Sequence, residues 1–343
     1  MIIDYPRHPL NQSRLYKVKS LAQLAEILKL SKTDMRYIAR DNDNYIRFTT
    51  KEGQDVQWPK PILRGAQKRA AQLLSRIETP NFLHSAKRGR SYITNAKRHS
   101  SMQPSVKIDI RIFFQSTRAP AVFDFFRAEM SCEPDVAAVL TKLMTVDGHL
   151  PTGGNASPIL SYFTYRDMFS EIEDLARQRG CVMTCLIDDL TLTGPGATRA
   201  LIYDVRRIIA RYRLWVHKTK IFKPDQPKII TGVAVTRIGY RVPNKHQVAI
   251  AEDVKSLAAA RCDEERLVIL RRVIGRMQEA AQIEPPWRKR ASSLVVQRRG
   301  IERRLRENAE MTANHADIAT SFPSGQSIRT REEVGPRRNA VCA

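Results

Sequence analysis

Cysteine is scarce in this sequence, and long apolar runs are absent. The five cysteines are an odd and sparse set, which is a poor disulfide framework, and Cys181 and Cys185 have no second ligand pair nearby that would suggest zinc. No apolar stretch approaches the ~18–20 residues that cross a bilayer, which argues against an integral membrane protein. The N-terminus lacks the apolar core of a signal peptide. We therefore expect a protein of the reducing cytoplasm.

Acidic residues are few relative to basic ones. Asp and Glu number 35 against 58 Lys and Arg, so the 343 residues carry a formal net charge of +23. A surplus of this size predicts a polyanionic partner, either nucleic acid or an acidic membrane. The hydrophobic share of 42% excludes a wholly disordered chain. The length suits one large domain or two modest ones, at ~100–200 residues each.

Hydrophobic periodicity predicts a mixture of helices and strands. Helical spacing occurs over 18–40, where Ser31 and Asp34 could cap a second short helix. The other expected elements are a hairpin over 45–59, helices over 61–78, 119–130, 159–179 and 197–213, a strand over 105–114, a hairpin over 181–194, strands over 227–236 and 238–250, and an arginine-rich helical region from 252 to about 310. Between them lie an irregular segment (83–99) and a glycine-rich loop (150–158), and the polar tail beyond about 311 is expected to be loose.

Two adjacent carboxylates, Asp188 and Asp189, interrupt the apolar run from Cys185 to Leu192. Desolvating two like charges side by side is costly, unless divalent cations neutralise them. Asp109, within the alternating strand, supplies a third carboxylate. Three carboxylates from two strand ends could hold two Mg²⁺ ions ~3.5–4 Å apart, the arrangement used for in-line phosphoryl transfer. The alternative is a solvated Asp-Asp turn and an ordinary strand-end aspartate.

Five segments together resemble a reverse transcriptase of the bacterial retron type. KIDIRIFF, LPTGGNASPILSYF and CLIDDLTLTG resemble the strand, loop and hairpin of the polymerase site. GRSYITNAKRH resembles the retron Asn-Ala-x-x-His element, and HKTKIFKPDQPKIITGVAV resembles the retron segment with a Val-Thr-Gly motif. The likeness covers roughly residues 20–300. The chain departs from the pattern at Leu186 and Ile187, where the family usually has Tyr-Ala, and at Thr152, where many reverse transcriptases carry Gln.

The resemblance implies an α+β right-hand polymerase with an antiparallel palm sheet backed by helices. It assigns 1–60 to an N-terminal helical extension and the start of the fingers, 61–104 to the fingers, 105–250 to the palm with fingers elements, 251–310 to a basic helical thumb, and 311–343 to a flexible tail. The implied activity is RNA-directed DNA synthesis from deoxynucleotides with two Mg²⁺ ions. The implied template is a cognate structured non-coding RNA, whose 2′-OH primes a branched RNA–DNA product, multicopy single-stranded DNA.

The resemblance also implies a role in phage defence together with a separate effector protein. It implies no membrane partner. One alternative is another bacterial reverse transcriptase, of the abortive-infection or group II intron type. A second is a catalytically impaired protein of the same fold that only binds RNA.

The resemblance also assigns roles within the reaction. Asp109, Asp188 and Asp189 become the metal ligands and catalytic residues, with the carbonyl of Ile110 as an extra ligand, and Phe114 becomes a steric gate against ribose. The other substrate-binding assignments are Lys87 and Arg90 for the triphosphate, Gly153 and Gly154 for close approach of nucleotide or template, and Lys218 or Lys220 as proton donor to pyrophosphate. Each has a plainer alternative: a core phenylalanine, solvated basic side chains, or a helix-entry turn.

A further group is assigned to RNA binding. Asn95 and His99 are four residues apart, so a helix would place them on one face, where they could hold the fold together or touch the RNA backbone. Thr231 and Gly232 could contact primer or RNA, although a tight turn also explains the glycine. The arginine-rich region, including Arg288 and Arg290, suits phosphate contacts along an A-form duplex.

Overall fold

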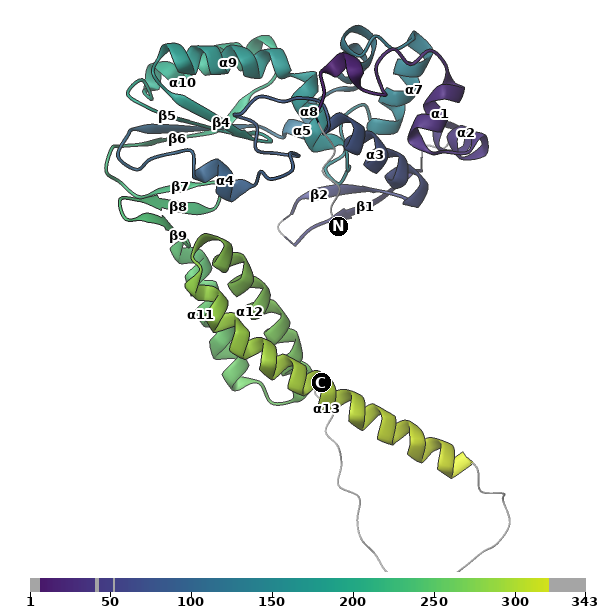
Figure 1. The fold of residues 1–343 in the computed structure, drawn as a ribbon, viewed down its shortest axis with the longest axis vertical. Coiled ribbons are helices and arrows are strands. Elements are labelled where there is room, and N and C mark those ends of the chain that lie inside the picture. Colours follow the sequence, from purple (N-terminus) through teal and green to yellow (C-terminus); the bar gives the residue numbers. More distant parts are fainter. Residues whose placement is uncertain (1–6, 41–42, 52, 321–343) are drawn as a thin grey trace, which may run out of the picture. The chain divides into compact units, whose positions relative to one another are not determined.

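The computed structural model describes residues 7–40, 43–51 and 53–320, which fall into two compact units that meet in sequence between Tyr240 and Arg241 (Figure 1). The helical elements of the first unit are η1 (Leu10–Gln12), α1 (Leu21–Leu28), α2 (Lys32–Arg40), α3 (Pro61–Leu74), α4 (Tyr92–Ala96), α5 (Phe113–Ser116), α6 (Ala119–Asp124), η2 (Phe125–Glu129), α7 (Pro134–Met144), α8 (Ser157–Thr164), α9 (Arg166–Gln178) and α10 (Arg199–Arg211). The strands are β1 (Tyr45–Thr49), β2 (Asp55–Pro59), β3 (Ser105–Ile110), β4 (Val182–Leu186), β5 (Asp189–Thr193), β6 (Val216–Phe222), β7 (Lys228–Ile230), β8 (Val233–Thr236) and β9 (Gly239–Arg241), the last of which crosses the boundary between the units.

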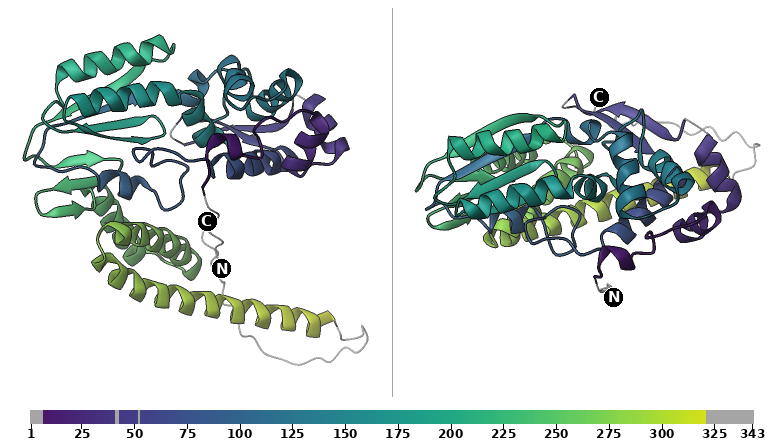
Figure 2. Two further views of the ribbon diagram at one scale, coloured as in Figure 1. Left: turned by 45° about the horizontal axis from the view of Figure 1, so that its top comes forward. Right: turned by 90° about the horizontal axis from the view of Figure 1, so that it is seen from above.

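A four-stranded antiparallel sheet, in the order β4-β5-β3-β6, forms the centre of the first unit. Alternation along β3 buries Val106, Ile108 and Ile110 completely, whereas Lys107 and Asp109 on the other face are only partly buried. Helices α9 and α10 cover the sheet (Figures 1 and 2) and pack on β4 and β6. The predicted α+β class, with an antiparallel sheet backed by helices, is confirmed.

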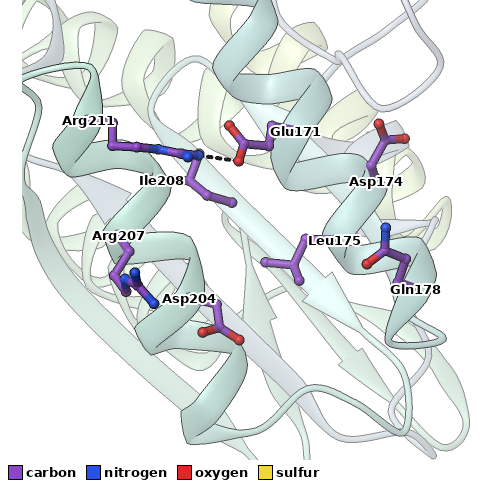
Figure 3. Close-up of a pocket in the computed structure, with 8 residues that line it drawn as sticks. All are labelled: Glu171, Asp174, Leu175, Gln178, Asp204, Arg207, Ile208 and Arg211. Atoms are coloured by element: carbon purple, nitrogen blue, oxygen red, sulfur yellow. Dashed lines mark hydrogen bonds and ion pairs between the residues drawn. The ribbon is translucent and has the colours of Figure 1, made fainter.

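Ion pairs hold α9 and α10 together on the side away from the sheet. Arg211 pairs with Glu171, and the Arg179 guanidinium lies 2.8 Å from the Asp204 carboxylate. Figure 3 shows the depression between the two helices, in which charges of both signs face one another across a small apolar floor. The charges of this surface are thus largely compensated.

A buried polar network lies beside the central strands. The His99 ring bonds through Nδ1 to Thr193 Oγ1 (2.8 Å) and through Nε2 to Thr184 Oγ1 (2.7 Å), so it ties β5 to β4. Thr193 also bonds to Ser105 Oγ on β3 (2.7 Å), which in turn accepts from the fully buried Lys228 ammonium (3.1 Å). The network therefore joins three strands of the central sheet to β7.

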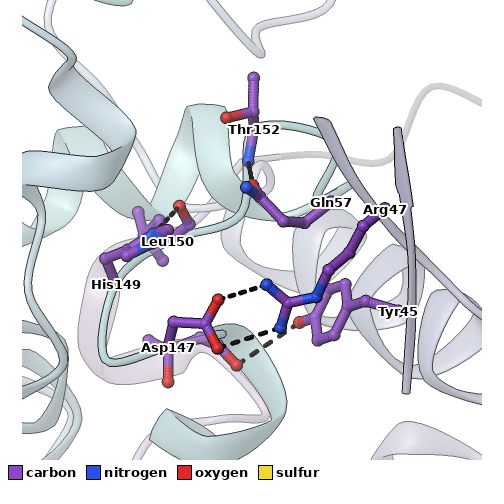
Figure 4. Close-up of polar contacts among 8 residues, drawn as sticks. Tyr45, Arg47, Gln57, Asp147, His149, Leu150 and Thr152 are labelled. Carbon is purple, nitrogen blue, oxygen red and sulfur yellow. Dashed lines mark hydrogen bonds and ion pairs between the residues drawn. The ribbon is translucent and has the colours of Figure 1, made fainter. Parts of the chain in front are cut away.

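The hairpin β1–β2 packs against the glycine-rich loop (Figure 4). Arg47 forms a bidentate pair with Asp147 (2.6 and 3.0 Å), and Gln57 Oε1 accepts from the Thr152 backbone N–H (3.1 Å). A Cβ on Gly153 would lie 2.7 Å from the Gln57 carbonyl oxygen. The absence of a side chain at Gly153 thus lets β2 approach, which favours a packing role for this glycine over contact with nucleotide.

Several predicted elements are confirmed. The region 18–40 contains two helices, and Ser31 caps the second by accepting from the Asp34 backbone N–H (2.9 Å). The hairpins predicted over 45–59 and 181–194, and the helices predicted over 61–78, 119–130 and 197–213, match β1–β2, β4–β5, α3, α6 with the π turn η2, and α10.

Other predictions need correction. The strand expected to run to 114 ends at Ile110, because Ile112 adopts a left-handed backbone (φ +40°) from which α5 begins. The helix expected over 159–179 is broken at Tyr165, whose buried ring packs on Phe113 at 5.7 Å between centroids. Strand β6 was not predicted, since its residues from Val216 to Phe222 alternate little in burial.

The second unit is helical and consists of α11 (Asn244–Ala259), α12 (Asp263–Ile283) and α13 (Pro286–Thr320). The arginine-rich helical region is thus confirmed, but the strand expected around 238–250 is wrong beyond β9, and the helix continues past 311, where a loose tail was expected. The buried Asp253 carboxylate binds Arg272 (2.8 Å) and Arg276 (2.6 Å), so part of the basic surplus is neutralised internally. Residues 321–343 of the predicted tail lie outside the described part of the chain.

None of the helices in the described ranges combines the length and apolar character needed to cross a membrane. Within the same ranges, Cys132, Cys181 and Cys185 are buried free thiols.

The His99 network predicts acid sensitivity. Burial, followed by the nearby His84 and Lys228, lowers the pKa of His99 from 6.5 to about 3. The unfolded chain therefore takes up this proton first, and the stability contributed by neutral His99 is lost as the pH falls below about 6.5. Between pH 7 and pH 5, the free energy of unfolding should fall by about 2 kcal/mol because of this residue. Urea unfolding at both pH values should show a smaller pH dependence in His99→Gln. The exposed His217→Gln should behave like wild type, and an unchanged pH dependence in His99→Gln would contradict this account.

Gly153 provides a test of the loop packing. Gly153→Ala should destabilise the fold by about 1–3 kcal/mol, because the new methyl group meets backbone rather than a flexible side chain. Gly65→Ala is the matched control, since its Cβ would point into open space within α3 and should stabilise the helix by about 0.5–1 kcal/mol. Thermal unfolding of both variants measures the difference, and equal shifts would show that the close contact with Gln57 is unimportant.

Candidate active site

The hairpin β4–β5 presents the two adjacent acids at its turn. Leu186 pairs with Asp189, so that Ile187 and Asp188 form a two-residue loop. Ile187 has a φ of +62°, a conformation that β-branched residues rarely adopt. The Ile110 backbone N–H donates to the Asp188 carbonyl oxygen (3.1 Å), which fixes the turn against the end of β3. The predicted hairpin with acids at its turn is therefore present.

The antiparallel register brings Asp109 to these acids. Asp109 on β3 is the direct partner of Asp189 on β5, and side chains at opposed positions project from the same face with Cβ atoms about 4.5–5.5 Å apart. The pKa of Asp188 is raised from 3.8 to about 6, mainly by burial and in smaller part by the charges of Asp109 and Asp189. The structure thus places Asp109, Asp188 and Asp189 near one another at one end of β3 and β5.

Lys107 neutralises one member of this group. Its Nζ lies 2.6 Å from Asp189 Oδ2, and this pair lowers the pKa of Asp189, although burial raises that pKa more strongly. Asp189 Oδ1 is buried and accepts no hydrogen bond from any part of the chain that the structure describes. One oxygen of the group is therefore occupied by an ammonium, and another still needs a cationic or hydrogen-bonding partner.

The donor chemistry of this group suits a hard divalent cation, because carboxylate oxygens are the ligands that Mg²⁺ prefers and Asp189 Oδ1 lacks a partner. Within the described ranges, no three His, Cys, Asp or Glu side chains are already arranged as a metal site. Asp189 Oδ2 instead contacts the ammonium of Lys107 on β3. The residues therefore fit a divalent cation by their donor chemistry.

A pocket adjoins Asp188, and it is formed by segments far apart in sequence. Gly53, Gln54 and Asp55 from the β1–β2 turn line one part of it. The remaining lining residues are Ile112, Phe113, Phe114, Gln115, Thr152, Ile187 and Asp188. Asp188 and the predicted gate Phe114 thus face the same pocket. The contribution of the β1–β2 turn could not be found from sequence, because its short polar residues carry no motif.

The two neighbouring phenylalanines have different surroundings. Phe113 is buried and packs on Tyr165 and Phe169, at 5.7 and 6.2 Å between ring centroids. Phe114 is only partly buried and lies beside Phe113 at 6.4 Å. Phe113 is therefore the core residue of the pair, and Phe114 remains available to the pocket.

The basic residues expected to hold the triphosphate lie elsewhere in the first unit. The Lys87 ammonium donates to the Thr79 carbonyl (3.0 Å) and the Pro80 carbonyl (3.3 Å), and burial lowers its pKa. Neither Lys87 nor Arg90 is among the described residues that line the pocket beside Asp188. Lys218, by contrast, is exposed on β6 directly opposite Asp109. Lys220 lies over the Phe222 ring, with Nζ 4.9 Å from its centroid.

The two segments that resemble retron elements contact each other. Asn95 Nδ2 donates to Thr231 Oγ1 (3.2 Å), and that hydroxyl donates to the Tyr92 carbonyl (2.8 Å). Gly232 supplies the left-handed backbone (φ +86°) of the turn after Thr231. His99 does not share a helix face with Asn95, because α4 ends at Ala96 and the His99 ring enters the buried network instead. Burial of both side chains favours a role in holding the fold.

Arg288 and Arg290 lie on α13 in the second unit. Both are exposed, and the Arg290 guanidinium stacks over the Trp287 ring at 4.9 Å from its centroid. Trp287 therefore has an intramolecular partner, while the two arginines stay accessible to a polyanion.

The amino-acid sequence is similar to that of several known proteins. No protein-family model matches the chain. The retron Se72 reverse transcriptase of Salmonella heidelberg is 26% identical over 215 residues, which is 59% of this chain and 57% of that protein. The retron Mx162 reverse transcriptase of Myxococcus xanthus is 26% identical over 270 residues (67% and 56%), and the retron Ec86 reverse transcriptase of Escherichia coli is 26% identical over 169 residues (48% and 52%).

The chain thus spans little more than half the length of these curated relatives. Identities between 22% and 29% recur across five retron enzymes, each matched over about half to two-thirds of this chain. These matches confirm the predicted resemblance: the chain is similar to retron-type reverse transcriptases.

Proposed function

We propose that the chain is an RNA-directed DNA polymerase of a retron. The observation that carries the proposal is the pairing of Asp109 with Asp189 across β3 and β5, with Asp188 beside them and facing a pocket. Three neighbouring carboxylates, of which Asp188 lines a pocket, suit chemistry on a phosphate-rich substrate in a protein of net charge +23. The similarity to retron reverse transcriptases supports the same activity.

In this proposal the central sheet with α9 and α10 is the palm, the β1–β2 hairpin and neighbouring helices are the fingers, and the second unit is the basic thumb. Asp109, Asp188 and Asp189 would hold two Mg²⁺ ions, which would activate the primer hydroxyl and offset the charge of the triphosphate. Lys218, the neighbour of Asp109 on β6, is better placed than Lys220 to protonate the leaving pyrophosphate. Arg90 and Lys87 as triphosphate ligands, and the Ile110 carbonyl as a metal ligand, stay predictions from the resemblance.

The retron assignment adds the nucleic acids. We propose a cognate structured non-coding RNA as template, a branched RNA–DNA product, and a role in phage defence with a separate effector. The Asn95–Thr231 hydrogen bond supports this assignment, because it joins the two segments that resemble retron elements. Arg288 and Arg290 would contact phosphates, and such binding should weaken steeply with salt. Sequencing the nucleic acid that co-purifies with the protein would identify the RNA.

The polymerase assignment is tested by Asp188→Asn. Removing this carboxylate should reduce primer extension on poly(rA)–oligo(dT) with dTTP and Mg²⁺ by about a hundredfold or more, since transition-state charge loses its compensation. Asp174→Asn is the matched control, because this carboxylate lies in the α9–α10 depression, outside the proposed site (Figure 3), and extension should persist. Absence of extension by the wild-type protein, with tight RNA binding intact, would instead favour an RNA-binding protein with an impaired polymerase fold.

The gate is tested by Phe114→Val. Shortening this side chain should leave room for a ribose 2′-OH and raise the ratio of ribonucleotide to deoxynucleotide incorporation by about tenfold or more. Single-nucleotide extension gives kcat/KM for each substrate. Ile187→Ala, which alters the same pocket beside Asp188, should affect both nucleotides alike. A ratio that rises equally in both variants, or in neither, would argue against a gate at Phe114.

A further inference from the structure

Lys107 is the residue whose position the proposed reaction leaves unexplained. It lies two residues before Asp109 on β3, so both side chains project from the same face of the sheet. Its direct partners are Thr191 on β5 and Lys220 on β6, yet its ammonium reaches diagonally to Asp189, with Nζ 2.6 Å from Oδ2. The Lys107 and Asp189 side chains are 27% and 16% exposed. This partial burial distinguishes the pair from an ordinary surface salt bridge.

The surroundings of Asp189 indicate what the ammonium does there. Asp109 lies directly opposite, Asp188 is adjacent in sequence, and all three carboxylates are partly buried. Gathering three such charges is costly without a counter-charge. Lys107 supplies one positive charge, whereas Asp189 Oδ1 stays buried without a hydrogen-bond donor in the described chain. The compensation is therefore incomplete, and the group keeps its attraction for a stronger cation.

We propose that Lys107 is a built-in counter-cation that stabilises the metal-free site and must release Asp189 before a divalent ion can bind this carboxylate fully. The proposal rests on the proposed function, since it concerns the same carboxylates. A divalent ion carries twice the charge of the ammonium and can reach several oxygens at once, so it wins the competition, but at reduced apparent affinity. Lys107 thus sets the metal concentration at which the site fills and keeps the empty site folded.

The chain offers a matched control for this role. Lys220 is the direct neighbour of Lys107 on β6, so its removal changes the local charge by the same amount. Its ammonium, however, lies over the Phe222 ring rather than on a carboxylate of the site. Comparing the two positions separates displacement of the ion pair from a general change in electrostatic potential.

The experiment measures Mn²⁺ binding to the full chain freed of nucleic acid, by the electron paramagnetic resonance signal of free Mn²⁺. Lys107→Gln should bind Mn²⁺ about tenfold more tightly than wild type, because no ammonium has to be displaced. Lys220→Gln should stay within about twofold, since a single exposed charge acts weakly through solvent. Lys107→Arg, which keeps the charge, should bind like wild type. Without metal, Lys107→Gln should unfold at a lower temperature, and saturating Mn²⁺ should remove that deficit.

Each outcome is decisive. Unchanged or weaker Mn²⁺ binding by Lys107→Gln overturns the proposal, the weaker result meaning that Lys107 positions Asp189 for the metal. Equal tightening in Lys107→Gln and Lys220→Gln also overturns it, in favour of a general charge effect. If Lys107→Gln does not fold, Lys107→Met and the Mn²⁺ dependence of wild-type unfolding decide instead. If Asp189→Asn and Asp188→Asn bind Mn²⁺ as tightly as wild type, the metal binds elsewhere, and both the proposed metal site and the Lys107 role are overturned; a failure confined to Lys107→Gln overturns the Lys107 role alone.

Discussion

The site depends on holding like charges together on facing strands. Asp109 and Asp189 are opposed at one end of the two central strands of an antiparallel sheet, an arrangement that electrostatics alone would disfavour. The other face of the same strands offsets that cost, because Val106, Ile108 and Leu190 are fully buried under helices. A one-residue slip of register would expose these apolar side chains, so the hydrophobic face fixes the position of the acids.

A second constraint comes from polar side chains that are buried and satisfied. His99 joins the two strands of the acidic hairpin through Thr184 and Thr193, and Lys228 extends the network through Ser105. Such networks hold one arrangement firmly, because breaking any bond leaves a buried polar group without a partner. The segment around the Asn-Ala-x-x-His element therefore supports the acidic hairpin from outside the proposed site, which explains chemically why a histidine belongs there.

The hydrophobic periodicity of the sequence was sufficient to predict the local elements and the hairpin that carries the two acids. These features depend on alternating apolar residues and on turn residues within a few positions of one another. The periodicity was insufficient where tertiary contacts decide. The end of β3 depends on the left-handed Ile112, and the role of Gly153 depends on the approach of Gln57 from a distant hairpin. The Lys107–Asp189 pair was also missed, because it depends on the register between β3 and β5, which neither strand's sequence determines by itself.

The central claim is that carboxylates from β3 and from the β4–β5 turn share bound cations. A crystal structure of the full chain with Mn²⁺ and a template–primer, phased on the manganese anomalous signal, tests it most directly. We expect anomalous peaks within about 2.2 Å of carboxylate oxygens of both Asp109 and Asp188. Peaks bound to only one of these strands, or manganese located away from both, would contradict it.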